Sequence, residues 1–155
     1  MIKKILKKIG KNSIISQKEI ASAAHEKRNA VLKLSSEIIS KNTNKIIEAN
    51  KEDLLLANKA GLKESYIDRL LLDSKRISAI SESLISISTL PDPLSGKITK
   101  WERPNGLVIS KQPTPLGVLG IIYESRPNVT VDAAALCIKS GNSVILRCGS
   151  DSYNS

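Results

Sequence analysis

The side chains best suited to chemistry gather at two points of the chain, each directly after a short apolar run. The first point is the turn Glu124-Ser-Arg-Pro-Asn128, and the second is Arg147-Cys-Gly-Ser150. An amide at a helix start can donate a hydrogen bond to a developing oxyanion, and the backbone N–H groups there favour an anion. A guanidinium beside a hydroxyl can hold a phosphate or a ribose hydroxyl. Both points are therefore candidates for chemistry on acyl or phosphate groups.

The proline of the first turn restricts its own backbone conformation and that of the residue before it. Pro127 fixes its own φ and disfavours the helical conformation in Arg126. Asn128 then lies at the start of the following helix, and two interpretations of its side chain stay open. It is either the helix N-cap or a donor to an oxyanion, and both hold only if another group caps the helix. Arg126, a cation at this anion site, is a candidate for binding a substrate phosphate or carboxylate.

The remaining reactive residue types argue against a nucleophile or a metal site in this chain. Cys137 and Cys148 are too few for a disulfide framework, and the single histidine, His25, lies far from both along the chain. Cys137 falls inside an apolar helical stretch and is expected to be a small core residue. Cys148 follows a cation that could lower the pKa of its thiol, but packing is the favoured role there as well.

Both chemical points are positioned by a predicted βαβ unit at residues 115–149. Residues 116–123 are nearly all apolar and uncharged, which is typical of a strand buried on both faces of a parallel sheet. A helix follows over 129–140 and stops at Gly141-Asn142, before a second apolar run at 143–146. Ligands bind such sheets at the carboxyl ends of the strands, and the polar residues lie at those ends.

Residues 1–90 are predicted to be helical and residues 97–112 to form a β-hairpin. Apolar residues at helical spacing indicate five helices, the third capped by Asn42-Thr43 and ended by Gly61. The Asn105-Gly106 pair suits a tight hairpin turn. The fold class is therefore α/β, with helices and a hairpin leading into the first βαβ unit of a larger sheet. Since two parallel strands make no stable doubly wound sheet, we expect the chain to be cut short.

The composition narrows the class of protein further. The 155 residues include no Phe and only one Trp, so a one-domain core must be aliphatic. The net charge of +9 suggests nucleic acid, but five of the positive charges are lysines at 3–11 with no aromatic residues between them for base stacking. A solvated surface is the favoured interpretation. Without an apolar run of about 18 residues or a secretory signal, a reducing cytoplasm and no membrane contact are expected.

The run 115–132, followed by 141–147, closely resembles the gamma-glutamyl phosphate reductases, also called glutamate-5-semialdehyde dehydrogenases, of the aldehyde dehydrogenase superfamily. The resemblance covers roughly residues 16–155. It extends upstream through His25-Glu-Lys-Arg-Asn-Ala30, Ile47-Glu-Ala-Asn-Lys-Glu-Asp53, Ala60-Gly-Leu62, Asp68-Arg-Leu70 and Trp101-Glu-Arg-Pro-Asn-Gly106. It implies that residues 1–155 are the N-terminal part of a Rossmann-like NADP-binding domain of aldehyde dehydrogenase type.

The resemblance also implies an activity: NADPH reduces L-glutamyl 5-phosphate to L-glutamate 5-semialdehyde and phosphate, in L-proline biosynthesis, through a thioacyl enzyme. Asn128 matches an oxyanion-hole asparagine. Arg147 matches a cofactor-ribose contact and is compatible with a 2′-phosphate, and Ser150 beside it is a second cofactor-binding candidate. The catalytic cysteine lies in a later domain that this chain lacks, so the chain alone is expected to be inactive. Cys148 and Asn154 depart from the glycine and histidine common in the family, which affects the expected cofactor contacts.

As partners, the resemblance implies the acyl phosphate substrate, the glutamate kinase that precedes it, and further copies of the full-length enzyme in a homo-oligomer. No metal and no nucleic acid are expected. Two alternatives stay open: another oxidoreductase of the same superfamily, or a non-catalytic basic module that binds nucleic acid through the lysines at 3–11.

Overall fold

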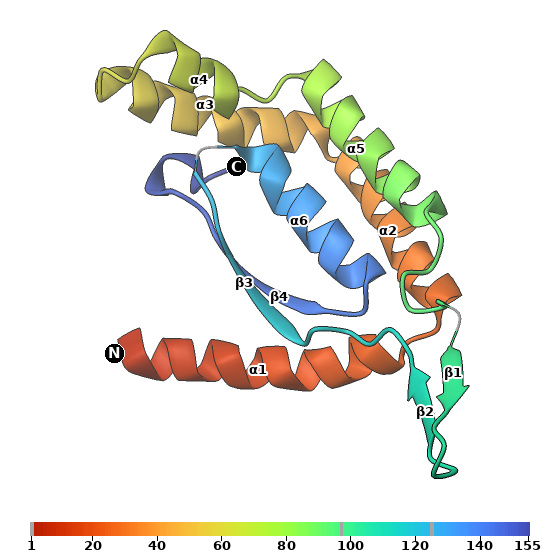
Figure 1. Ribbon diagram of the computed structural model, residues 1–155. Helices are drawn as coiled ribbons and strands as arrows, with labels where there is room; N and C mark the ends of the chain where they lie inside the picture. Colours follow the sequence, from red (N-terminus) through yellow and green to blue (C-terminus); the bar gives the residue numbers. More distant parts are fainter. Residues whose placement is uncertain (1, 97, 125) are drawn as a thin grey trace.

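The computed structural model describes residues 2–96, 98–124 and 126–155, and it shows a layer of helices beside a small parallel sheet (Figure 1). Along the chain the elements are α1 (Ile2–Ser22), α2 (His25–Lys41), α3 (Thr43–Lys59), α4 (Glu64–Leu70), α5 (Ser74–Thr89), β1 (Thr99–Glu102), β2 (Val108–Lys111), β3 (Val118–Ile122), α6 (Pro127–Lys139), β4 (Ser143–Arg147) and the short 3₁₀-helix η1 (Ser150–Ser152).

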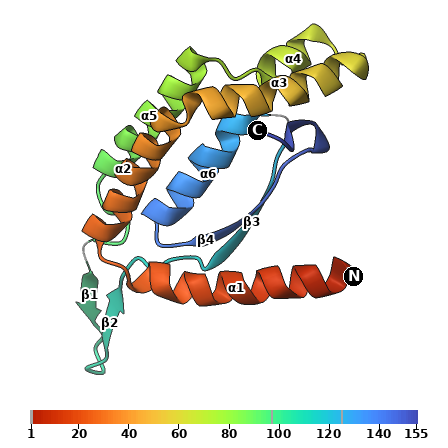
Figure 2. The ribbon, with the colours of Figure 1, turned by 180° about the vertical axis from the view of Figure 1, so that it is seen from behind.

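The predicted βαβ unit is present as β3, α6 and β4. The two strands pair in parallel, with Val118 opposite Ser143 and Ile122 opposite Arg147. Their carboxyl ends therefore lie at one edge of the sheet. Opposite views show α6 on one side of the strands and α1 on the other (Figures 1 and 2). The predicted hairpin is present as the antiparallel pair β1–β2, and its turn contains Gly106 at a φ of +81°.

The core is aliphatic, as the composition predicts. One cluster joins Leu32 of α2, Leu84 and Ile87 of α5, and Ala135 of α6. A second cluster joins residues 72, 77 and 80 around the α4–α5 connection. Burial of each large aliphatic side chain contributes about 1.5 to 3 kcal/mol to folding. The helices α2, α5 and α6 are thus fixed against one another, and α6 is held in place behind the sheet.

The prediction that the first strand of the unit is buried on both faces is wrong. Val118 and Ile122 of β3 are 37% and 75% exposed. In the described part of the chain the sheet has two strands, so each is an edge strand with one unpaired side. The α1 helix contacts both strands but leaves large apolar side chains of its own exposed, among them Ile5 and Leu6.

The helix boundaries near residue 42 follow the prediction, but the capping contacts do not. Asn42 stands at the N-cap position of α3, yet its side chain makes no cap hydrogen bond to that helix. Its Nδ2 donates instead to the Ile38 carbonyl, and the Thr43 hydroxyl donates to the Ser40 carbonyl. Both side chains therefore close the end of α2. The α3 helix ends as expected: Gly61 has a φ of +66°, and the Leu62 N–H bonds the Ala57 carbonyl.

A buried polar network ties the far end of α6 to α2 and to the segment after α5. Arg28, 4% exposed, donates from its Nη2 to both carboxylate oxygens of Asp92 at 3.0 and 3.1 Å, and from its Nη1 to the Lys139 carbonyl. Lys139 donates from its Nζ to the Asn29 side chain and to the Ser88 carbonyl. Burial lowers the pKa of Lys139. Burial by itself would raise the pKa of Asp92, but the Leu94 N–H, Arg28 and His25 together hold it below its ordinary value.

Because the pKa of Asp92 is lowered in the folded state, its ionised form stabilises the protein above the ordinary aspartate pKa of about 3.9. That contribution is lost as the pH falls through the lower folded-state pKa. We expect Asp92→Asn to reduce the free energy of unfolding by about 2 kcal/mol at neutral pH, since Arg28 then remains buried without its counterion. The reduction should shrink progressively below pH 4, as measured by urea unfolding at each pH.

Asp68→Asn is the matched control, because the Asp68 carboxylate pairs with Arg76 while 66% exposed. A solvent-exposed ion pair contributes little to stability, so this variant should change the free energy of unfolding by less than about 1 kcal/mol, both at neutral pH and below pH 4. Equal pH dependence in the two variants would show that the Asp92 contact is not the source of the effect.

Candidate functional site

The turn between β3 and α6 is built as its proline predicts. Arg126 has φ −140° and ψ 91°, an extended conformation, and occupies the N-cap position of α6. Pro127 is the first helical residue, a position where its missing N–H costs nothing. Asn128 is consequently the second helical residue, and the interpretation of Asn128 as the N-cap is wrong. Its exposed side chain makes none of the hydrogen bonds found between described residues, so its amide remains available to a ligand.

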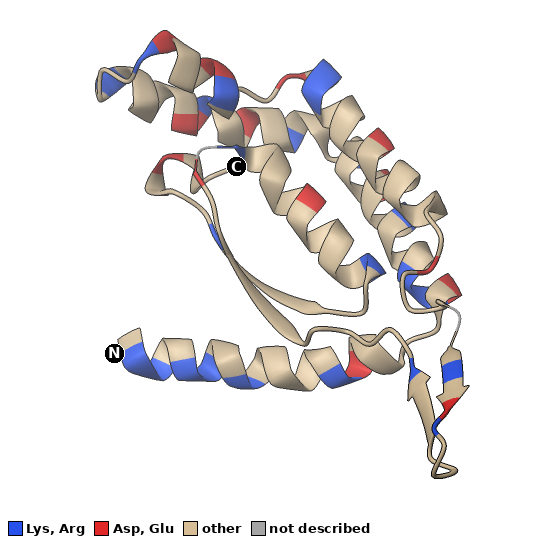
Figure 3. Cartoon of the chain, viewed as in Figure 1, with Lys and Arg blue, Asp and Glu red and all other residues tan. Residues whose placement is uncertain are grey.

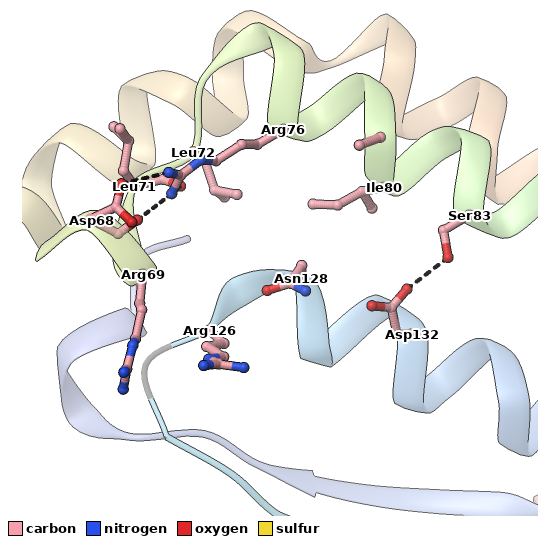
Figure 4. Close-up of a pocket in the computed structure, with 11 residues that line it drawn as sticks. Asp68, Arg69, Leu71, Leu72, Arg76, Ile80, Ser83, Arg126, Asn128 and Asp132 are labelled. Carbon is pink, nitrogen blue, oxygen red and sulfur yellow. Dashed lines mark hydrogen bonds and ion pairs between the residues drawn. The ribbon is translucent and has the colours of Figure 1, made fainter. Parts of the chain in front are cut away.

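Asn128 lines a hollow of about 460 Å³ between the start of α6 and the helices α4 and α5, here called the helix hollow (Figure 4). Arg69 and Arg126 lie at one end of it, and Asp132 lies farther along α6. The Asp132 carboxylate accepts a hydrogen bond from the Ser83 hydroxyl of α5 at 3.0 Å. Apolar side chains, Leu71, Leu72 and Ile80 among them, complete the lining. The helix hollow thus has a largely apolar wall, with arginine side chains at one end and the Asn128 amide and Asp132 carboxylate along α6.

A second hollow of about 750 Å³ lies where the two strands of the parallel sheet end, and we call it the strand-end hollow. Three guanidinium groups line it, from Arg69, Arg126 and Arg147. They outnumber the two carboxylates of the lining, Glu124 and Asp151, so the strand-end hollow favours an anion. Arginine binds phosphate through a planar set of donors, which makes this arrangement suited to a phosphorylated ligand.

The two hollows adjoin, because Arg69 and Arg126 line both. Arg147 and Ser150 line only the strand-end hollow, whereas Asn128 lines only the helix hollow. The structure therefore brings Arg126, Arg147 and Ser150 together, as their positions after parallel strands predict. It places Asn128 in the adjoining helix hollow.

The sequence-based interpretation missed two residues of these linings, Arg69 and Asp132. Asp132 could have been found, because it stands four residues after Asn128 and so shares a helix face with it. Arg69 carries no such local signal, since it reaches the site through the packing of α4.

The segment after β4 is held by side chains of α3 and α4. Asp53, 1% exposed, accepts hydrogen bonds from the backbone N–H and side-chain amide of Asn154, and from the N–H and hydroxyl of Ser155. The Tyr66 hydroxyl donates to Asp151 at 2.8 Å. These contacts fix the course of residues 150–155 and with it the wall of the strand-end hollow. No local pattern in the sequence predicts these contacts.

Of the two cysteines, Cys137 lies in the kind of environment that the sequence predicts. Cys137 is a core residue, 4% exposed, and burial raises the pKa of its thiol. Cys148 is half-buried, and both cysteines are free. Over the described ranges, no three His, Cys, Asp or Glu side chains are placed to hold a metal ion together. In the same ranges, every helix is too short or too polar to cross a bilayer.

Known structures with the same architecture include an NAD-dependent benzaldehyde dehydrogenase from Corynebacterium glutamicum, with a TM-score of 0.67 at 20% identity. The match covers 90% of this chain and 28% of that one. At this identity the likeness concerns the fold, which is that of the aldehyde dehydrogenases. The predicted fold class is thereby confirmed. No protein-family model matches the chain.

Two further relatives are similar in sequence as well. The gamma-glutamyl phosphate reductase of Allorhizobium ampelinum is 52% identical over 147 residues, which are 95% of this chain and 34% of that protein. The crystal structure of gamma-glutamyl phosphate reductase from Thermotoga maritima has a TM-score of 0.88 and 39% identity, covering 93% of this chain and 35% of that one. The chain is therefore related to the gamma-glutamyl phosphate reductases, as its motifs indicate, and spans about a third of their length.

The contacts of Asp53 lead to a test of how the segment after β4 is held. We expect Asp53→Asn to speed hydrogen exchange of the Asn154 and Ser155 amides at least tenfold, because a side-chain NH₂ then faces groups that also donate. Each hydrogen bond to a charged group contributes about 1.5 to 3 kcal/mol. Exchange followed by NMR gives the measurement. Glu52→Gln, at the exposed neighbouring position, removes the same charge and should leave both rates unchanged; equal acceleration in the two variants would contradict the assignment.

Proposed function

We propose that this chain supplies the N-terminal part of the NADP-binding domain of a reductase that converts L-glutamyl 5-phosphate to L-glutamate 5-semialdehyde in L-proline biosynthesis. The observation that carries the proposal is the 52% identity to a gamma-glutamyl phosphate reductase over nearly the whole chain. The arginine-lined hollow at the strand ends supports it independently, since both the proposed substrate and the proposed cofactor carry phosphate groups.

The strand-end hollow is the proposed cofactor site. Its volume lies in the range of about 300 to 1,000 Å³ usual for small-molecule and cofactor sites. Arg147 would bind phosphate or ribose oxygens of NADPH, and the Ser150 hydroxyl would accept or donate a further hydrogen bond. The residues present thus fit a phosphorylated nucleotide. When bound, NADPH supplies the hydride of the reduction.

The proposed substrate contacts come from the start of α6. The Asn128 amide would donate to the acyl oxygen as negative charge develops on it, which lowers the barrier to attack on the acyl carbon. Arg126, whose side chain lines both hollows, would bind the phosphate of the substrate and stabilise it as it leaves. The buried thiol of Cys137 is poorly suited to be the nucleophile, because its raised pKa disfavours the thiolate.

The matched relatives are about three times as long as this chain. The cellular setting and the partners of the full-length reductase are therefore part of the proposal. The proposed setting is the cytoplasm, with a homo-oligomer of the full-length enzyme and glutamate kinase as the upstream partner. An oxidoreductase of the same superfamily acting on a different aldehyde is the second candidate function, supported by the shared fold with the benzaldehyde dehydrogenase.

The proposed cofactor site predicts that the chain binds NADPH more tightly than NADH. Arg147→Gln should weaken NADPH binding at least tenfold in calorimetric titrations, because a charge-assisted contact to a phosphate is lost. Arg103→Gln is the matched control, since Arg103 lies in the turn of the distant β1–β2 hairpin. Equal affinities for the two nucleotides, or an Arg147 variant that binds NADPH normally, would contradict the assignment of Arg147.

The cysteine assignments predict that the 155-residue chain, supplied with NADPH and L-glutamyl 5-phosphate, produces no L-glutamate 5-semialdehyde. Formation of the aldehyde, followed by trapping with o-aminobenzaldehyde, would be measured beside a full-length gamma-glutamyl phosphate reductase as positive control. Aldehyde formation by the chain alone would mean that Cys148 or another of its groups serves as the nucleophile.

A further inference from the structure

Asp132 is a carboxylate in the helix hollow that the proposed reaction steps do not use. The other carboxylate of the lining, Asp68, is in an ion pair with Arg76 at 2.6 Å. Asp132 takes part in none of the ion pairs found between described residues, and among those residues its hydrogen-bond partner is the neutral Ser83 hydroxyl. It is half-buried in an apolar-walled space, where an uncompensated negative charge favours a cation.

The charges that border the helix hollow are separated along its length. Arg69 and Arg126 lie at one end, with their guanidinium groups directed to the strand side of the start of α6, where the two hollows adjoin; Asn128 follows, and Asp132 lies farther along α6 (Figure 4). A ligand that extends from this junction along α6 would contact positive groups first, then an amide donor, and then a negative group. Electrostatic complementarity therefore favours a ligand with an anionic group at one end and a cationic group at the other.

The spacing of the two α6 side chains matches the proposed substrate. Asn128 and Asp132 are four residues apart on one helix face, which corresponds to a rise of about 6 Å. In a glutamyl phosphate the acyl carbon and the α-nitrogen are four bonds apart, or about 5 Å when extended. A substrate with its acyl oxygen at Asn128 and its phosphate at Arg126 thus brings its α-ammonium group to Asp132.

We propose that Asp132 binds the α-ammonium group of the substrate and makes this site selective for amino-acid acyl phosphates over acyl phosphates without an amino group. The inference rests on the proposed function and adds a specificity-determining residue to it. Ser83 orients the carboxylate by donating to one of its oxygens, which leaves the other oxygen for the ligand.

The test uses two stable probes on the 155-residue chain. L-2-amino-6-phosphonohexanoate replaces the acyl phosphate by a phosphonate of the same length, and 6-phosphonohexanoate lacks only the amino group. We expect the amino probe to bind the unaltered chain at least ten times more tightly, in NMR titrations that also report shifts at Asn128 and Asp132. Asp132→Asn should reduce this ratio to less than twofold, whereas Arg126→Gln should weaken both probes by the same factor.

Two controls separate recognition from folding. The side-chain oxygen introduced by Asp132→Asn can still accept the Ser83 hydrogen bond, and the thermal unfolding temperature of this variant should remain within a few degrees of that of the unaltered chain. Glu102→Gln, which removes an exposed carboxylate of β1, should leave both probe affinities unchanged. Ser83→Ala should keep most of the preference for the amino probe, because the charge of Asp132 is retained.

Equal binding of the two probes by the unaltered chain, a preference that survives Asp132→Asn, or no detectable binding of either probe would overturn the assignment of Asp132. These outcomes are distinct from failure of the reductase proposal, which is judged by NADPH binding at Arg147 in the other hollow. A chain that binds NADPH but treats the two probes alike retains its proposed function and loses only this specificity residue.

Discussion

The parallel pairing of β3 with β4 is the constraint on which the proposed cofactor site depends. Because Ile122 pairs with Arg147, the turn after one strand and the segment after the other begin at the same edge of the sheet. The Tyr123 N–H extends this pairing by one bond to the Arg147 carbonyl. A slip of one residue would turn every side chain of the shifted strand to the opposite face and move Arg147 away from Arg126. Guanidinium groups 21 positions apart in the sequence converge because this register is kept.

The two ends of α6 are treated differently by the fold. Its carboxyl end is fixed by the Arg28–Asp92–Lys139 network. The absence of a side chain at Gly141 lets Leu94 pack closely against this end, since a Cβ at position 141 would lie 2.9 Å from the Leu94 side chain. The φ of +73° at Gly141 likewise suits glycine. Its amino end borders the two hollows and carries the groups proposed to bind ligand. Charged groups that pair with one another inside the protein thus hold the carboxyl end of α6, whereas charged groups that face the hollows at its amino end can bind a ligand.

The elements and the strand-end residues could be predicted from the sequence because their signals are local. Helical spacing, the Asn-Gly turn and the apolar runs each report on a few neighbouring residues. The burial of β3 depends on what covers the sheet, and the error there was one of tertiary context. The N-cap alternative for Asn128 could have been excluded from the sequence, since proline favours the first helical position and so shifts the N-cap to Arg126. Arg69 and Asp53 act across the fold and could be placed only once the helices were packed.

The two basic residue types are distributed differently over the structure. The chain has 18 lysines and 6 arginines, and the lysines at 3–11 lie along α1, away from the helix layer (Figure 3). Four arginines, at 69, 76, 126 and 147, line one or both hollows, and no lysine in the described ranges does so. Lysine keeps a strongly hydrated point charge, whereas the guanidinium is less hydrated and offers paired donors to phosphate. Much of the excess positive charge therefore lies along α1, while the smaller set of arginines lines the hollows proposed to bind phosphate groups.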